Sequence, residues 1–176
     1  MRSDASRIRL RDLTLADADL VDAWHNDPDR SEFNDFGEPQ SPLPRDVLAE
    51  GPLRNEHNGM LMVETLDGQP IGTVGWHKVR YGPSPQSDAW NFGIELRPEA
   101  RGRGYGTAAQ RELARYLFAT TDVNRVEAST DVENIAEQRA LEKAGYVREG
   151  IQRGSQYRAG AYHDLVTYAR LREDPA

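Results

Sequence analysis

The stretch EARGRGYGTAA, residues 99–109, places three glycines at alternate positions between two regular elements. Gly102, Gly104 and Gly106 follow a strand-like run and precede a helix-like run. Glycine weakens both helices and strands, so three of them mark a turn whose backbone has a special task. Backbone N–H groups that converge at a helix N-terminus bind anions, and the helix dipole adds to the attraction. The stretch therefore predicts a turn that holds a phosphate or a pyrophosphate.

Two well-known phosphate loops do not match these letters. A Walker loop needs Gly-Lys-Ser/Thr after four spacers, and the dinucleotide fingerprint needs G-x-G-x-x-G, whereas this chain has G-x-G-x-G. The chain also lacks the early strand–helix–strand unit that the fingerprint requires. An RG-type nucleic-acid segment would be longer and would not be framed by secondary structure.

Composition narrows the class of protein further. The 176 residues predict one domain over residues 1–176. The chain has no cysteine, which excludes a disulfide scaffold or a thiolate metal site, and we expect no metal. A net charge of −7 argues against nucleic acid as a partner and is compatible with a cationic ligand. The start of the chain lacks the apolar core of a signal peptide, and no run is long enough to span a membrane. We therefore expect a cytoplasmic protein with no membrane partner.

Hydrophobic periodicity and turn residues predict the order of the elements. The predicted elements are a strand at 8–13, a helix within 14–28, a loop or broken helical segment at 31–45, a hairpin at 60–81 that turns at Asp67-Gly68, a strand at 89–98, a helix at 107–120, a strand at 124–130, a helix at 134–145 and two strands within 146–171. Strands outnumber helices and a hairpin comes early. The pattern thus predicts an α+β fold and not a doubly wound sheet.

The glycine turn resembles the acyl-CoA loop of the GNAT superfamily of N-acetyltransferases. Residues 101–106, RGRGYG, match its pattern Arg/Gln-x-x-Gly-x-Gly/Ala, and NIAEQRALEKAGY, residues 134–146, is similar to a second motif of the family. The resemblance covers nearly the whole chain, from IRLRDLTLADADLV to YHDLVTYARL, and is closest to the branch of the ribosomal-protein N-terminal acetyltransferases. It implies a GNAT-type domain with a mixed, mostly antiparallel central sheet, flanking helices and strands that splay at the acyl-CoA site.

The resemblance also implies acetyl-CoA as co-substrate and a set of residues that bind it. Loop amides from about Gly102 to Thr107 would bind the pyrophosphate, and the strand before the loop would pair with the pantetheine arm as if it were another strand. Asn134 would contact pantetheine; it can equally cap the following helix as a pair with Glu137. The implied residues are Ile94, Leu96, Arg101, Gly102, Arg103, Gly104, Tyr105, Gly106, Thr107 and Asn134.

Acetyl transfer to an amine requires the loss of a proton from a nitrogen whose ordinary pKa is near 10.4. Glu95 is the first candidate base, because it lies on the polar face of the strand that ends at the loop; as an alternative it is a surface Glu or pairs with a neighbouring Arg. His77, on the hairpin, is the second candidate. The family's usual acid is a Tyr or a Ser, and Leu141 and Glu137 stand in their places. This leaves water or the helix dipole to assist thiolate departure.

The acceptor pocket is expected between the early helices and the final hairpin. Glu32, Asp35 and Tyr162 are the candidate residues, because carboxylates and aromatics suit a cationic amine; a solvated loop and an ordinary hairpin are the alternative. The acceptor would be a peptide or protein α-amine, or an amine-bearing small molecule such as a polyamine, an amino acid or an antibiotic. The alternative function is a non-catalytic acyl-CoA sensor or partner-binding module. Dimerisation through the apolar strands stays open.

Overall fold

The structure is a computed structural model that describes residues 7–175. These residues form one seven-stranded sheet with helices on both faces. The strands are β1 (Ile8–Asp12), β2 (Asn58–Thr65), β3 (Pro70–Arg80), β4 (Asp88–Leu96), β5 (Arg125–Asp131), β6 (Val147–Arg158) and β7 (Ala161–Leu171). The helices are α1 (Ala18–His25), α2 (Arg45–Glu50), α3 (Tyr105–Thr120) and α4 (Ile135–Lys143), with short 3-10 turns η1 (Leu15–Asp17), η2 (Glu32–Asn34), η3 (Pro85–Ser87) and η4 (Pro98–Ala100).

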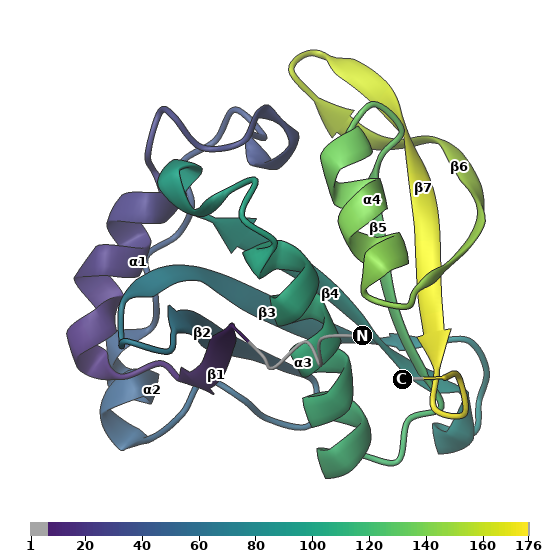
Figure 1. The fold of residues 1–176 in the computed structure, drawn as a ribbon, viewed down its shortest axis with the longest axis horizontal. Helices are drawn as coiled ribbons and strands as arrows, with labels where there is room; N and C mark the ends of the chain where they lie inside the picture. Colours follow the sequence, from purple (N-terminus) through teal and green to yellow (C-terminus); the bar gives the residue numbers. More distant parts are fainter. Residues whose placement is uncertain (1–6, 176) are drawn as a thin grey trace.

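The sheet has the order β1-β2-β3-β4-β5-β7-β6, and every neighbouring pair except one is antiparallel. The exception is the parallel pair β4–β5, which is joined only at Trp90–Val126 and Asn91–Glu127. Beyond these two positions the strands separate, so the sheet divides into a β1–β4 half and a β5–β7 half (Figure 1). The predicted α+β fold with splayed strands is confirmed.

The main core lies between the sheet and α3. Trp90 and Phe92 of β4 are buried against Leu113 and Leu117 of α3. In the β5–β7 half, α4 adds Leu141 to the same core. A second, smaller cluster packs α1 and α2 against the opposite face of β2: Leu13, Ala18, Val21, Leu43, Leu48 and Met62.

Turn residues set several of the boundaries. Asp67-Gly68 closes the β2–β3 hairpin with Gly68 at φ 88°, and Gly145 ends α4 at φ 92°, both in the left-handed region that favours glycine. The predicted helix within 14–28 begins as η1 and becomes α1 only at Ala18. The 31–45 segment contains only η2 and leads into α2, a helix that the sequence did not predict as a separate element.

Two predictions concern the chain ends and the membrane. Residues 1–6 and 176, at the limits of the predicted single domain, lie outside the described residues. Within the described residues, every helix is too short or too polar to cross a membrane.

Candidate functional site

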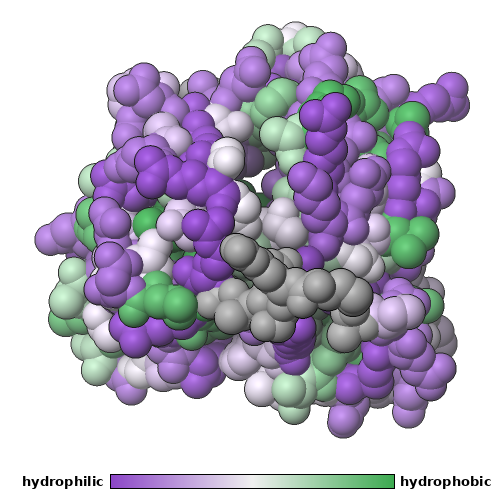
Figure 2. All heavy atoms as spheres, in the orientation of Figure 1, coloured by the Kyte–Doolittle hydropathy of each residue, from purple (hydrophilic) through white to green (hydrophobic). Residues whose placement is uncertain are grey.

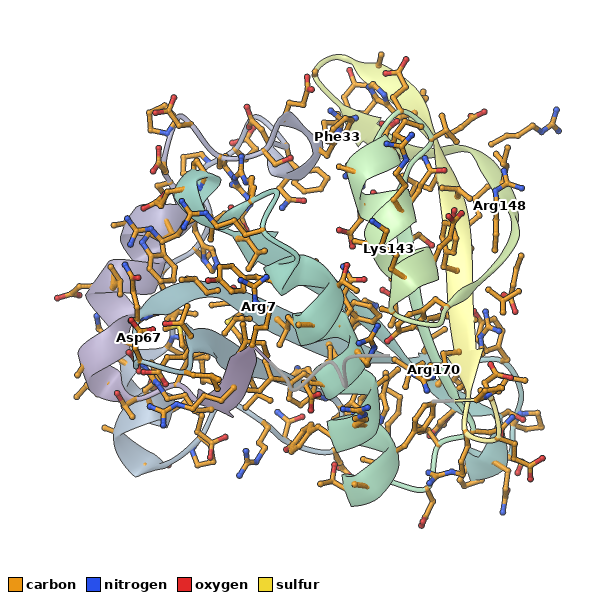
Figure 3. The ribbon with its side chains drawn as sticks, viewed as in Figure 1. Arg7, Phe33, Asp67, Lys143, Arg148 and Arg170 are labelled. Carbon is orange, nitrogen blue, oxygen red and sulfur yellow. The ribbon has the colours of Figure 1, made fainter. Side chains whose placement is uncertain are left out.

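A cleft lies where β4 and β5 separate. Its volume is about 520 Å³, and the glycine turn, β4, β5, η2 and α4 all contribute to its walls. In the space-filling view a hollow opens between the two halves of the molecule, with hydrophilic residues on its visible rim (Figure 2). Phe33 and Lys143, from η2 and α4, belong to the lining (Figure 3). The lining residues are Ser31, Phe33, Asn34, Phe92, Gly93, Ile94, Leu96, Arg101, Gly102, Gly104, Gly106, Thr107, Ala128, Ser129, Thr130, Asn134, Ala136, Glu137, Arg139, Ala140 and Lys143.

The glycine turn has the conformation that its sequence requires. Gly102 and Gly104 have φ values of 71° and 82°, and Gly104 is the N-cap of α3. A Cβ atom at either position would meet nothing within 4 Å, so the backbone angle and not crowding favours glycine there. The N–H groups of the first turn of α3 have no partner within the helix and open onto the cleft. This end of the cleft fits a pyrophosphate.

The two arginines of the turn differ in position. Arg101 lines the cleft, and its Nε donates to the Leu96 carbonyl oxygen at 3.0 Å. Arg103 and Tyr105 do not line the cleft: the Arg103 carbonyl accepts a hydrogen bond from Arg7 Nη1, and the Arg7 guanidinium lies 5.4 Å from the centre of the Tyr105 ring. Of the two arginines, only Arg101 is therefore placed to contact an anion in the cleft.

The helix α4 closes the other side of the cleft. Asn134 caps it, because its Oδ1 accepts the Glu137 N–H at 3.2 Å, while its Nδ2 donates to Thr130 Oγ1 at 3.0 Å. The reciprocal half of the predicted capping pair is absent: the Asn134 N–H donates to the Asp131 carbonyl oxygen. The carboxyl of Glu137 instead accepts from Gln110 Nε2 at 2.7 Å, and burial raises its pKa to about 7. From the sequence, Glu137 was predicted only to cap the helix with Asn134, and it was identified as a departure from the family pattern.

Glu95 lies between Ile94 and Leu96 in sequence, and its side chain is on the face of β4 that points away from the cleft. It lines a small hollow of about 20 Å³ with Trp24, His25 and Arg30. Arg30 Nη2 lies 3.4 Å from Glu95 Oε2, so the alternative of an Arg-paired Glu is realised in this structure. Arg30 Nη1 also donates to the His25 carbonyl oxygen at 2.7 Å. Burial lowers the pKa of His25, although the nearby Glu95 carboxylate opposes the shift.

The structure does not bring the remaining predicted residues to the cleft lining. His77 shares a face with Glu95 but is exposed, and its β4 partner is Asn91, four residues from Glu95 along the strand. Asp35 is exposed, and its Oδ1 accepts the Gly37 N–H. Tyr162 is 74% exposed and packs edge-on against Tyr157. The side chain of Glu32 is also exposed, next to cleft-lining neighbours.

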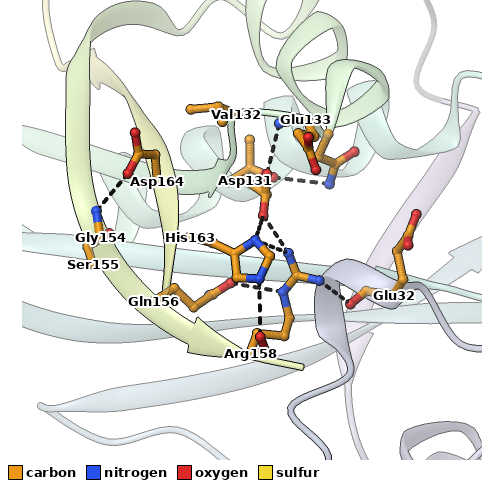
Figure 4. Close-up of polar contacts among 12 residues, drawn as sticks. Glu32, Asp131, Val132, Glu133, Gly154, Ser155, Gln156, Arg158, His163 and Asp164 are labelled. Atoms are coloured by element: carbon orange, nitrogen blue, oxygen red, sulfur yellow. Dashed lines mark hydrogen bonds and ion pairs between the residues drawn. The ribbon is translucent and has the colours of Figure 1, made fainter. Parts of the chain in front are cut away.

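A buried ion-pair cluster joins η2 to the β5–β7 half (Figure 4). Arg158, near the end of β6, pairs with Asp131 Oδ2 and donates from Nη1 to the Glu32 carbonyl oxygen at 2.9 Å. His163 Nδ1 lies 3.2 Å from the same Asp131 oxygen, and the Arg158 guanidinium lies 5.3 Å from the centre of the Phe33 ring. The cluster anchors the 31–34 segment, in which Ser31, Phe33 and Asn34 line the cleft. Sequence reasoning missed it, because its members come from three distant segments.

Comparisons with known proteins agree with this geometry. A model of the acetyltransferase (GNAT) domain family matches residues 7–147. The N-acetyltransferase p20 of Bacillus licheniformis, an uncharacterized protein, is 22% identical over 176 residues, which cover 97% of this chain and 96% of that protein.

Two solved structures share the fold. The spermidine N-acetyltransferase from Vibrio cholerae, in complex with CoA and spermine, has a TM-score of 0.78 at 22% identity and covers 96% of this chain and 98% of its own. The ribosomal-protein-S5-alanine acetyltransferase from Vibrio fischeri has a TM-score of 0.75 at 20% identity and covers 96% and 94%. At these identities the likeness establishes the fold alone.

Proposed function

The chain belongs to the GNAT acetyltransferase family, and from that premise we propose that it transfers the acetyl group of acetyl-CoA directly to a primary amine, with Glu95 as the base. The family supplies the enzyme class and the co-substrate. One observation carries the finer proposal: Ile94 and Leu96 of β4 face the cleft, and Glu95 between them faces the other side of the sheet. One strand thus contacts the donor on one face and the acceptor on the other.

The two ends of the cleft suit different parts of acetyl-CoA. The glycine turn and the N-terminus of α3 would hold the pyrophosphate, and Arg101 adds a positive charge there. Beyond Asn91, the edge of β4 is no longer hydrogen-bonded to β5, and its backbone would pair with the amides of pantetheine. Asn134 lines the same cleft. A strand amide near Leu96 would donate to the carbonyl oxygen of the acetyl group as its negative charge grows.

Glu95 would accept the proton that the attacking amine loses. An alkylamine with a pKa of about 10.4 is mostly protonated at neutral pH, so a nearby carboxylate both attracts the ammonium and takes up its proton, directly or through water. Arg30 competes for the same oxygen at 3.4 Å. The acceptor amine must therefore displace Arg30 or reach Glu95 through a water molecule.

The acceptor would enter between η2 and the β6–β7 hairpin. Two acceptor classes have support from proteins of the same fold: a polyamine, as in the spermidine N-acetyltransferase, and a protein α-amine, as in the S5-alanine acetyltransferase. The exposed side chains of Glu32, Asp35 and Tyr162 would meet the outer part of the acceptor. The net charge of −7 suits a cation of either class.

The test is release of free thiol from acetyl-CoA with a panel of amines: N-terminal peptides, polyamines, amino acids and aminoglycosides. We expect release that depends on one class of acceptor, and we expect Glu95→Gln to lower it by about 100-fold. Glu56→Gln is the matched control, because its side chain is 81% exposed and lies away from the cleft. Binding of acetyl-CoA without thiol release across the panel would refute the transferase proposal and favour the non-catalytic module.

A further inference from the structure

The position of Glu137 is unusual for a glutamate in the first turn of a helix. Such a side chain commonly turns back to the N-cap N–H, where solvent reaches it. Here it is partly buried between α3 and α4, and it also lines the cleft. Its partner, Gln110, is fully buried in α3, and Gln110 Oε1 has no hydrogen-bond partner among the described residues. Glu137 and Gln110 thus form a polar pair between α3 and α4.

We propose that Glu137 is the general acid of this enzyme and protonates the sulfur of CoA as it leaves. The inference rests on the proposed transferase function and adds to it the one role that sequence reasoning left unassigned. It stands on the placement of a carboxyl group in the cleft wall, on the α4 side, opposite the β4 strand whose other face carries the base. Base and acid then lie on opposite sides of the acetyl group.

The step balances with these two groups. The amine nitrogen forms a bond to the carbonyl carbon and loses a proton to Glu95, directly or through water. The carbon–sulfur bond then breaks, and the sulfur takes the proton of the Glu137 carboxyl, which becomes a carboxylate. After CoA leaves, Glu137 regains a proton from solvent through the open cleft, and Glu95 loses the one it accepted.

The surroundings of Glu137 keep a proton available at neutral pH. Burial raises its pKa to about 7, whereas an ordinary Glu with a pKa of about 4.3 would be ionised. An alkyl thiol such as that of Cys has a pKa of about 8.5, so transfer from this carboxyl to a thiolate is downhill. A pKa close to the working pH is the value that favours general acid catalysis.

The charged and titratable groups around Glu137 come from four segments. Gln110 on α3 is neutral, and burial raises the pKa of Tyr146, just before β6, whose hydroxyl donates to the Gln110 carbonyl oxygen at 3.3 Å. On α4 itself Arg139 and Lys143 line the same cleft, and Arg101 lines it from the glycine turn. These three cations suit the phosphates of CoA, whereas within residues 7–175 the Glu137 carboxyl accepts a hydrogen bond from the Gln110 amide alone.

Gln110 can form a hydrogen bond with either protonation state of the Glu137 carboxyl. Its amide nitrogen donates to the carboxylate, as observed, and after a flip of the amide its oxygen accepts from the protonated acid. A carboxylate partner such as Asp would repel the ionised state, and a Lys or Arg would stabilise it too strongly. A neutral amide leaves the proton free to leave and return.

The first experiment measures protonation in the wild-type protein. Carboxyl carbon-13 NMR, compared between wild type and Glu137→Gln, should show one resonance that titrates near pH 7 and is missing in the variant. Glu133→Gln, an exposed substitution before α4, should retain it. If every Glu resonance titrates near 4 to 5, the typical range for glutamate, the inference is overturned.

The second experiment uses two acyl donors with any amine that supports turnover. With acetyl-CoA, Glu137→Gln should lower kcat by about 100-fold while the Kd for CoA, measured by calorimetry, changes little. With the selenoester analogue, whose selenolate leaves without a proton, the variant should approach wild type. An equal loss with both donors would mean that Glu137 only positions the helices, and the inference would fall.

The outcomes separate this inference from the proposed function. If Glu95→Gln loses turnover and Glu137→Gln keeps it, the transferase stands and the general acid proposed here does not. If wild-type protein transfers acetyl groups to none of the amines, both proposals fall together. Loss in both variants, with selenoester rescue in Glu137→Gln alone, supports both.

Discussion

Replacing Glu137 by Gln should stabilise the protein at alkaline pH, and the size of the gain follows from its burial. The carboxyl has a pKa of about 7 in the folded chain against a reference of 4.5, the value for an exposed Glu. That difference, at about 1.4 kcal/mol per pH unit, sets a ceiling of about 3 kcal/mol. Because part of the side chain is exposed in the cleft, we expect about 1–3 kcal/mol.

The sign follows from proton counting. Between pH 4.5 and 7 the folded protein holds a proton on Glu137 that the unfolded chain has released, so this group makes the wild type less stable as pH rises. Its stabilising contribution is complete below pH 4.5 and is lost by about pH 7. The neutral amide of Gln has no such dependence and keeps a hydrogen bond to Gln110. The free energy of unfolding of the variant should therefore exceed that of wild type at pH 8 and approach it at pH 5.

Urea unfolding at pH 5 and pH 8 measures this difference. Subtraction of wild type from variant at each pH removes the titrations that both proteins share, because distant sites add independently. Glu133→Gln should differ from wild type by less than about 0.5 kcal/mol at both pH values, since its side chain is exposed. A Glu137→Gln difference that is the same at pH 5 and pH 8 would refute the burial argument.

Three further perturbations test other parts of the structure. Glu95→Gln should lower kcat by about 100-fold and leave the calorimetric Kd for CoA unchanged, because Glu95 faces away from the cleft; a weaker Kd would contradict that placement. Gly104→Ala should lower the free energy of unfolding in urea by roughly 1 kcal/mol, because φ is 82°, and should weaken CoA binding; unchanged values would argue against the left-handed N-cap. Asp131→Asn leaves the buried Arg158 charge without its anion, and thermal unfolding should report a loss of about 3–5 kcal/mol; a loss below about 1 kcal/mol would show that the pair contributes little.

Local chemistry explains why much of the fold could be predicted from the sequence. The alternation in β4 placed Trp90 and Phe92 in the core because successive side chains of a strand point to opposite faces. Gly145 ends α4 because it adopts a φ of 92° that other residues avoid. The glycine turn combines both kinds of signal. Gly102, Gly104 and Gly106 line the cleft, whereas Arg103 and Tyr105, which the resemblance also implied, do not.

The acceptor side could not be predicted in the same way, because its contacts join distant parts of the chain. Arg30 meets Glu95 across 65 residues, and Arg158 meets the Glu32 carbonyl across 126. Sequence reasoning chose exposed acidic and aromatic residues there by their chemistry. No local pattern shows which residues of a loop face a cleft, because the loop is held by partners elsewhere.

Glu137 shows how a single residue pattern can have two structural outcomes. Asn134 followed by Glu three residues later predicts a capping box. One of its two hydrogen bonds is present, in which the Asn134 side chain accepts the Glu137 N–H. The other half fails because Gln110, fully buried on α3, offers a neutral donor inside the wall of the cleft. A carboxyl kept there lowers stability at neutral and alkaline pH, and an apolar residue or an amide would avoid that loss. If both the stability gain and the loss of turnover are found in Glu137→Gln, they have one physical cause: a proton held in a partly buried carboxyl, where it weakens the fold and is available to the leaving thiolate.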